Sequence, residues 1–62
     1  MERPVVPVVY ADELVELMGE QVIDARDVLR GTGLIRASLR NPDALITAEQ
    51  QLRIYENARA FS

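Results

Sequence analysis

The strongest structural signal in this 62-residue sequence is the segment 47–61, which reads TAEQQLRIYENARAF. Thr47 and Gln50 have the spacing of a capping box, in which each side chain accepts a hydrogen bond from the backbone amide of the other residue. Behind this box, apolar residues recur at helical intervals: Leu52, Ile54, Tyr55, Ala58 and Phe61. The pattern predicts a helix over 47–61 that is still running at Ser62, because no glycine or proline follows it.

Shorter helices are predicted over residues 11–18, 22–30 and 35–40. Gly19 and Gly31 follow the apolar residues of the first two, at positions where glycine commonly ends a helix. Asp24 can act as an N-cap within the second helix. Pro42 ends the third, because the residue before a proline avoids the helical region of backbone conformation.

Residues 1–10 are predicted to form an extended arm. Pro4 and Pro7 interrupt its four valines, and proline both removes a backbone donor and is excluded from a helix interior. Four exposed valines favour aggregation, so we expect the arm to pack along the helices or an edge strand, or to join a partner.

The predicted fold is therefore all-α, with three or four short helices and an amino-terminal arm in a single segment, 1–62. Its predicted core is Leu14, Leu17, Val28, Leu29, Leu34, Leu39, Ile46, Leu52 and Tyr55. A chain of this length buries only about 60% of its unfolded surface, and it has no cysteine or histidine for a disulfide or zinc staple. Together with the unterminated last helix, this favours a fragment of a larger domain.

The charge balance disfavours contact with nucleic acid. Seven arginines, no lysine and ten acidic residues give a net charge of -3, whereas phosphate binding needs clustered positive charge. No apolar run approaches the ~20 residues that span a bilayer, and the start of the chain lacks the pattern of a signal peptide. The sequence predicts a cytoplasmic protein with no membrane partner.

Groups that could perform chemistry are present but have simpler explanations. The acidic residues Asp12, Glu13, Glu16, Asp24 and Asp27 fit solvated helix faces and first turns better than a desolvated acid–base pair. The hydroxyls of Thr32, Ser38, Thr47 and Ser62 have no conventional base nearby in sequence, and Asp24, Asp27 and Asp43 lack the spacing of a calcium loop. We therefore predict no enzyme and assign no catalytic, metal-binding or cofactor-binding residue.

Three further patterns are also interpreted structurally. Gly31-Thr32-Gly33 lacks the lysine and third glycine of a phosphate loop and is predicted to be a helix-ending turn. The region 14–29 could form a helix-turn-helix, but Asp24 and Asp27 would carry the wrong charge towards phosphates. Tyr55 and Phe61 could line a ligand pocket, although such a stripe is more often core.

One stretch resembles a known family. The residues concerned are Val28-Leu29-Arg30-Gly31-Thr32-Gly33-Leu34, Leu39, Asn41-Pro42-Asp43-Ala44, Ile46-Thr47, Glu49-Gln50, Leu52 and Tyr55-Glu56-Asn57-Ala58. In letters and spacing they resemble the opening of the amino-terminal sensor domain of AraC-family transcriptional regulators, in the branch with an arabinose-binding-type domain. The resemblance covers residues 22–62, about two-thirds of the chain, and leaves the arm unmatched.

The resemblance implies the helical start of a sensor and dimerisation domain, followed in family members by an effector pocket and by two DNA-binding helix-turn-helix motifs. The expected role is then to help the sensor part fold or dimerise. The expected partners are a second copy or the remainder of the regulator, with promoter DNA reached only through a carboxy-terminal domain and a small-molecule effector of unknown identity. The competing hypothesis is a free-standing acidic interaction module, such as an antitoxin or anti-activator, that folds against a basic target.

Overall fold

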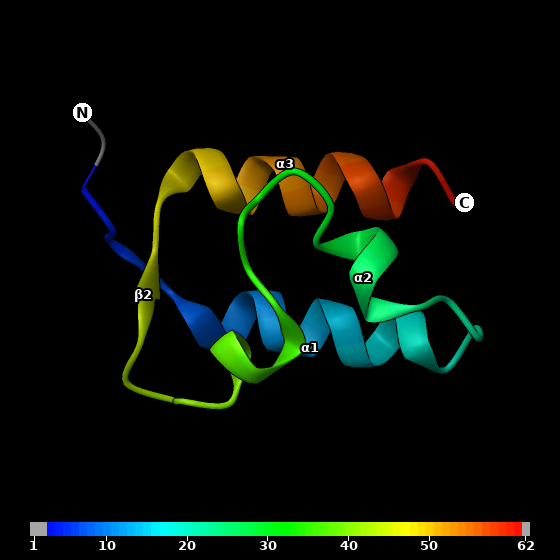
Figure 1. Ribbon diagram of the computed structural model, residues 1–62, viewed down its shortest axis with the longest axis horizontal. Coiled ribbons are helices and arrows are strands. Elements are labelled where there is room, and N and C mark those ends of the chain that lie inside the picture. Colours follow the sequence, from blue (N-terminus) through cyan, green and yellow to red (C-terminus); the bar gives the residue numbers. More distant parts are fainter. Residues whose placement is uncertain (1–2, 62) are drawn as a thin grey trace.

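The computed structural model describes residues 3–61 (Figure 1). In chain order its elements are β1 (Val6–Pro7), α1 (Val8–Gly19), α2 (Ala25–Val28), the 3-10 helix η1 (Arg36–Leu39), β2 (Leu45–Ile46) and α3 (Ala48–Arg59). The structure confirms the prediction of a mostly helical fold. The prediction of a strictly all-α fold is wrong, because β1 and β2 form a small sheet.

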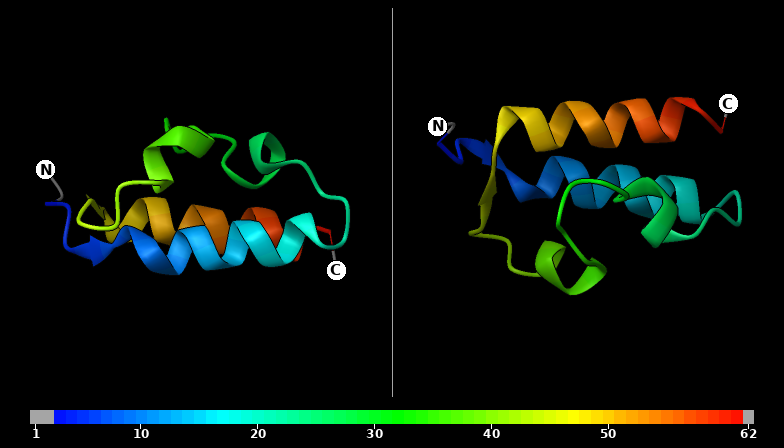
Figure 2. Two further views of the ribbon diagram at one scale, coloured as in Figure 1. Left: turned by 90° about the horizontal axis from the view of Figure 1, so that it is seen from below. Right: turned by 45° about the horizontal axis from the view of Figure 1, so that its top comes forward.

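The two long helices form one layer of the molecule. α1 and α3 lie side by side and run in the same direction (Figure 1). Residues 20–44, which include α2 and η1 and are called the connecting segment below, lie across one face of this pair (Figure 2). Within residues 3–61, no element covers the opposite face of the α1–α3 pair.

The amino-terminal arm is anchored by the sheet. β1 pairs with β2 in antiparallel register, with Val6 opposite Ile46. The amide of Val5 donates to the carbonyl of Ile46, and the amide of Val8 donates to the carbonyl of Ala44, both at 3.0 Å. Pro7 sits between these donors, at a position where its missing N–H is not needed. The expectation that the arm packs against an edge strand is confirmed.

The predicted extent of the arm is wrong, because α1 begins at Val8 and not at residue 11. Pro7 is its N-cap, with an extended backbone, so the proline precedes the helix and costs it no hydrogen bond. The first two turns then place Val8 and Ala11 in the core in line with Val15 and Met18. Burial at intervals of three and four outweighs the weak helix propensity of the valines.

The two middle helices are shorter than predicted. α2 covers only Ala25–Val28 of the predicted 22–30, although Asp24 is its N-cap as expected and accepts from the amide of Arg26 at 2.8 Å. The predicted helix over 35–40 is a single 3-10 turn, in which the hydroxyl of Ser38 accepts from the amide of Ile35. Segments this short have too few internal hydrogen bonds to be stable without packing.

The start of α3 matches the sequence prediction in detail. The hydroxyl of Thr47 accepts from the amide of Gln50 at 3.0 Å, and the side-chain oxygen of Gln50 accepts from the amide of Thr47 at 2.8 Å. Both partners of the predicted capping box are therefore in place. α3 ends at Arg59, two residues before the predicted end.

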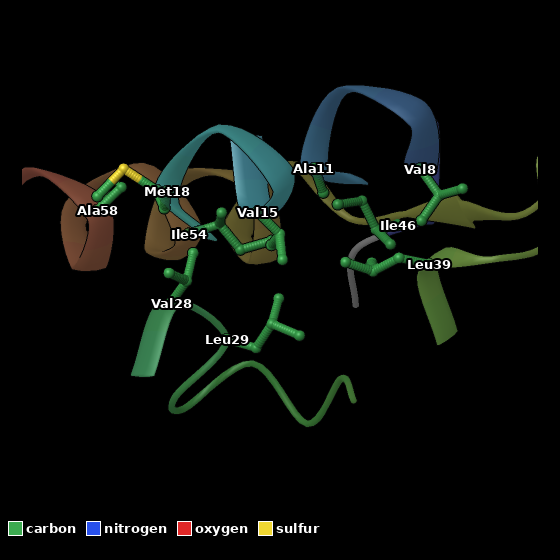
Figure 3. Packing of buried hydrophobic residues seen from close by; sticks show 10 residues of the cluster. All are labelled: Val8, Ala11, Val15, Met18, Val28, Leu29, Leu39, Ile46, Ile54 and Ala58. Carbon is green, nitrogen blue, oxygen red and sulfur yellow. The ribbon is translucent and has the colours of Figure 1, made fainter. Parts of the chain in front are cut away.

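The core lies between the α1–α3 pair and the connecting segment (Figure 3). Its buried apolar residues are Val8, Ala11, Val15, Met18, Val28, Leu29, Leu39, Ile46, Ile54 and Ala58. Of the predicted core, Val28, Leu29, Leu39 and Ile46 are confirmed, while Leu14 and Leu34 are partly buried at its edge. The prediction is wrong for Leu17, Leu52 and Tyr55, each of which is more than half exposed.

The turn after α1 places a strained residue at its tip. α1 ends at Gly19 as expected, but the left-handed backbone conformation after it falls on Val22, with φ of 62°. A β-branched residue is disfavoured there because its Cβ approaches the backbone. Val22 is 94% exposed, so packing against the core does not offset this strain.

Replacing Val22 with asparagine should therefore stabilise the protein. Val22→Asn is expected to raise the free energy of unfolding by about 1 kcal/mol, since asparagine tolerates the left-handed region and little packing is lost. Urea denaturation followed by circular dichroism measures the change. Val22→Thr keeps the branched Cβ and serves as the control, with a change within about 0.5 kcal/mol. An Asn variant no more stable than the Thr variant would contradict a strained turn.

Candidate interaction surface

The uncovered side of α1 carries apolar side chains. Tyr10, Leu14 and Leu17 are spaced by four and three residues, so they share one side of the helix, next to the buried line that starts at Val8. Tyr10 is 55% exposed and Leu17 is 53% exposed. α1 therefore has two apolar stripes, of which only one faces the core.

α3 contributes Tyr55 to the same side of the molecule. Tyr55 is 52% exposed. It lines a shallow groove of about 220 Å³ together with Tyr10, Leu14 and Leu17 of α1 and with Glu13. We call these four apolar residues the α1–α3 face: Tyr10, Leu14, Leu17 and Tyr55. Leu52 is 59% exposed and lines a different groove, beside Thr32 and Arg53.

Carboxylates border this face along α1. The helix and the residue after it carry Asp12, Glu13, Glu16 and Glu20 and no basic residue. Glu13 lines the groove itself, and Glu20 follows it by seven residues, two turns further along the same side. The ion pairs within residues 3–61 leave both of these glutamates out. The outer edge of the face along α1 is therefore acidic and open to solvent.

The edge along α3 has mixed charge. Glu49 and Glu56 are exposed and alternate along the helix with Arg53 and Arg59. Among residues 3–61, Glu56 and Arg53 form no ion pair with each other. The field along this edge is nevertheless weaker than along α1, because charges of both signs alternate.

On its far side, α1 is held to the connecting segment by Arg36. Its guanidinium donates to the carboxylates of Asp12 and Glu16, the latter at 3.3 Å. The hydrogen bond to Asp12 raises the pKa of Arg36 above its ordinary value. These contacts lie between η1 and α1, away from the α1–α3 face.

Two amide side chains of α3 bind the loop that follows α2. Asn57 donates from Nδ2 to the carbonyl oxygens of Val28 and Arg30, both at 2.8 Å. Gln50 donates from Nε2 to the carbonyl oxygen of Thr32 at 3.0 Å. Carbonyl groups at and after the end of a helix have no hydrogen-bond donor within that helix. The amide nitrogens of Asn57 and Gln50 are the donors here. We call this arrangement the amide clamp.

Beside the clamp lies a groove of about 670 Å³. It is lined by Gly31, Thr32, Thr47, Glu49, Gln50, Leu52, Arg53 and Glu56. Gly31 has φ of 80°, and a Cβ there would come within 3.3 Å of Nε of Arg53. The groove is wide and open. Of its polar side chains, Thr47 and Gln50 are taken up by the capping box and the clamp.

Asp24 and Asp27, two of the carboxylates considered for chemistry, are engaged in structural contacts. Asp24 caps α2, where hydrogen bonds from the side chain and the backbone amide of Arg26 lower its pKa. Asp27 pairs with Arg30 at 2.7 Å. Among residues 3–61 no three acidic side chains are grouped as metal ligands.

The hydroxyls are likewise bonded within turns and caps. Thr32 donates to the carbonyl of Leu29 at 2.6 Å and accepts from the amide of Leu34, within the turn that the two glycines close with positive φ. The interpretation of Gly31-Thr32-Gly33 as a helix-ending turn is thus confirmed. The prediction for Ser62 lies outside the described residues.

The suggested aromatic stripe is wrong as a single feature. Tyr55 lines the groove against α1, whereas Phe61 lies beside Asp27, Arg30 and Asn57 on another side of α3. Six residues of helix correspond to about 600°, so even a continued helix would point the two side chains about a third of a turn apart. They therefore share neither the core nor a pocket.

The α1–α3 face itself was missed because Leu14, Leu17 and Tyr55 were assigned to the core and Tyr10 to the extended arm. The available signal was that α1 has more apolar positions than one buried stripe can use, since Val8, Ala11, Val15 and Met18 already fill it. No helix among residues 3–61 has the length and hydrophobicity to cross a membrane. Comparison with models of protein families, with curated proteins and with solved structures finds no match for this chain.

The assignment of buried and exposed positions on α3 can be tested by truncating one residue of each kind. Ile54→Ala should lower the free energy of unfolding by about 2–5 kcal/mol, because Ile54 is fully buried. Leu52→Ala should change it by less than about 0.5 kcal/mol. Ile54→Val, expected to cost about 0.5–1.5 kcal/mol, keeps the comparison measurable if the alanine variant is unfolded. Equal losses at Leu52 and Ile54 in urea denaturation would contradict the exposure of Leu52.

The amide clamp can be tested at Asn57. Asn57→Ala should lower the free energy of unfolding by about 1–3 kcal/mol, since two carbonyls lose their donor. Asn57→Asp should cost more, because a carboxylate has no N–H and places negative charge against both carbonyls. Glu56→Gln, an exposed neighbour, is the control and should stay within about 0.5 kcal/mol. If Asn57→Asp is as stable as the unaltered chain by thermal denaturation, the clamp is not formed in solution.

Proposed function

We propose that this chain is a non-catalytic packing segment of a ligand-responsive transcription regulator. In this role it helps the sensor part of the regulator fold or dimerise in the cytoplasm, and it does not touch DNA itself. The single observation that carries the proposal is the α1–α3 face. Apolar side chains on two adjacent helices, exposed together, are typical of a surface that another protein segment covers.

The physical argument is the cost of leaving this face in water. Burial of apolar surface is favourable by roughly 25 cal/mol per Å², and a 62-residue chain has little stability to spare. Leu17 and Tyr55 also have the spacing of core residues. A segment that covers these residues would bury them, as their spacing predicts.

The resemblance to the sensor domain of AraC-family regulators gives the larger context of the proposal. Its motif contains Val28, Arg30 and Thr32 in one block and Gln50 and Asn57 in another, and these are the residues that the amide clamp joins. A sequence pattern whose separate parts bind one another is more informative than isolated matching letters. This supports a shared local structure as the reason for the resemblance.

In the proposed regulator, the segment would link effector occupancy to DNA binding by shifting the balance between two packings. Such a shift requires that the effector bind one packing more tightly than the other. An interface of moderate size, formed through the α1–α3 face, is suited to this because its free energy is small enough to be changed by a ligand.

A second candidate is a free-standing acidic interaction module. The observation that favours it is that all the helices contribute to one core and that β1 and β2 close the end of the structure. The chain can then be a folded unit that captures a partner through the same face. Its net charge of -3 suits a basic target.

Reading the coding sequence beyond codon 62 separates the two candidates. The regulator predicts an open frame that ends in two helix-turn-helix motifs. A stop codon directly after Ser62 would overturn it in favour of the free-standing module. Sedimentation of the chain and of Leu17→Ser provides the second measurement, in which concentration-dependent association lost in the variant supports dimerisation through the face.

A further inference from the structure

We propose that the α1–α3 face binds one amphipathic helix whose basic residues lie along the acidic edge of α1. The inference rests on the proposed function, since it names the partner chemistry of the surface by which the chain is proposed to act. It identifies the occupant from three properties of the face: its shape, its extent and the charge along its border.

The shape of the face fits a helix lying along it. α1 and α3 are adjacent and point the same way (Figure 2). The groove that lies between them is lined from both helices. Tyr10, Leu14 and Leu17 line one wall over two turns, and Tyr55 lines the other. A third helix with apolar residues at intervals of three and four can place them between these walls.

The extent of the face matches a single helix better than a second copy of the chain. Its three exposed apolar side chains, Tyr10, Leu17 and Tyr55, are each about half accessible and present roughly 300 Å² in total, whereas a standard stable interface uses about 800 Å² on each partner. One amphipathic helix can cover this area with its apolar side. A dimer built on this face alone would fall short of the usual area.

The charge along the border selects a basic helix. Glu13 and Glu20 lie on the outer edge of α1, without ion-pair partners among residues 3–61 and without a basic residue on that helix. Lysine or arginine beside the apolar stripe of the occupant would meet both carboxylates. A second copy could bring only the arginines of α3, which alternate with Glu49 and Glu56. Charge complementarity of this kind contributes specificity and speeds association.

The test uses three synthetic peptides of one composition class and the 62-residue chain. Each has ~18 residues, above the ~12–15 at which isolated helices become marginal. The first has leucines at intervals of three and four flanked by lysines, the second replaces every lysine with glutamate, and the third is a scrambled form of the first. Fluorescence anisotropy of the labelled peptides measures binding at low and high salt.

The lysine peptide is expected to bind with one-to-one stoichiometry, and its affinity should fall as the salt concentration rises. The other two peptides should bind at least tenfold more weakly. Leu17→Ser should lower the affinity for the lysine peptide at least tenfold. Ile35→Ser is its matched control, since Ile35 is 66% exposed in the connecting segment. Binding to the control should change by less than twofold.

A charge reversal isolates the acidic edge. Glu13→Lys should lower the affinity for the lysine peptide about three- to tenfold and raise the affinity for the glutamate peptide. Asp43→Lys changes the net charge equally, in the exposed turn before β2, and should have less than a twofold effect. Equal effects at positions 13 and 43 would overturn the proposal, because attraction would then follow net charge and not the border of the face. Circular dichroism of each variant verifies that it is folded.

Other outcomes separate this proposal from the proposed function. Equal binding of the lysine and glutamate peptides overturns the basic helix. Absence of peptide binding, with self-association of the chain that Leu17→Ser abolishes, also overturns it and leaves the packing role intact, since a second copy then covers the face. The proposal that the chain is part of a regulator is overturned only by the codons that follow codon 62. The peptide experiments do not test it.

Discussion

The structure depends on the first turn of α3, where one side chain has two roles. The oxygen of Gln50 closes the capping box with Thr47, and its nitrogen donates to the carbonyl of Thr32. The first contact begins the helix directly after β2, and the second fixes that helix against the loop after α2. The start of α3 and the position of the connecting segment are thereby determined together.

The connecting segment has little stability of its own and depends on α1 and α3 for order. α2 and η1 are each four residues long, so their internal hydrogen bonds cannot offset the backbone entropy of ordering them. Asn57 holds the end of α2, Arg36 holds η1 to α1, and Val28, Leu29 and Leu39 bury their side chains between the long helices. Secondary structure here is a consequence of tertiary contacts.

That division explains which features could be predicted from sequence. The capping box, the N-cap at Asp24 and the glycine turn are local, and the residues that make them stand within a few positions of each other. The pairing of β1 with β2, directly before α1 begins at Val8, joins residues 40 positions apart, such as Val6 and Ile46. Local sequence patterns do not contain this information. The amide clamp likewise spans 27 residues from Arg30 to Asn57.

The wrong core predictions carry a physical meaning of their own. Leu17, Leu52 and Tyr55 were placed in the core because their spacing prepares them for burial, and in this chain the elements that could bury them all lie on the other side of α1 and α3. Local pattern and tertiary structure usually agree, and disagreement concentrates at functional surfaces. Leu17 and Tyr55 come from different helices and line one groove, with Glu13 at its border. This is the arrangement that the proposed amphipathic basic helix requires.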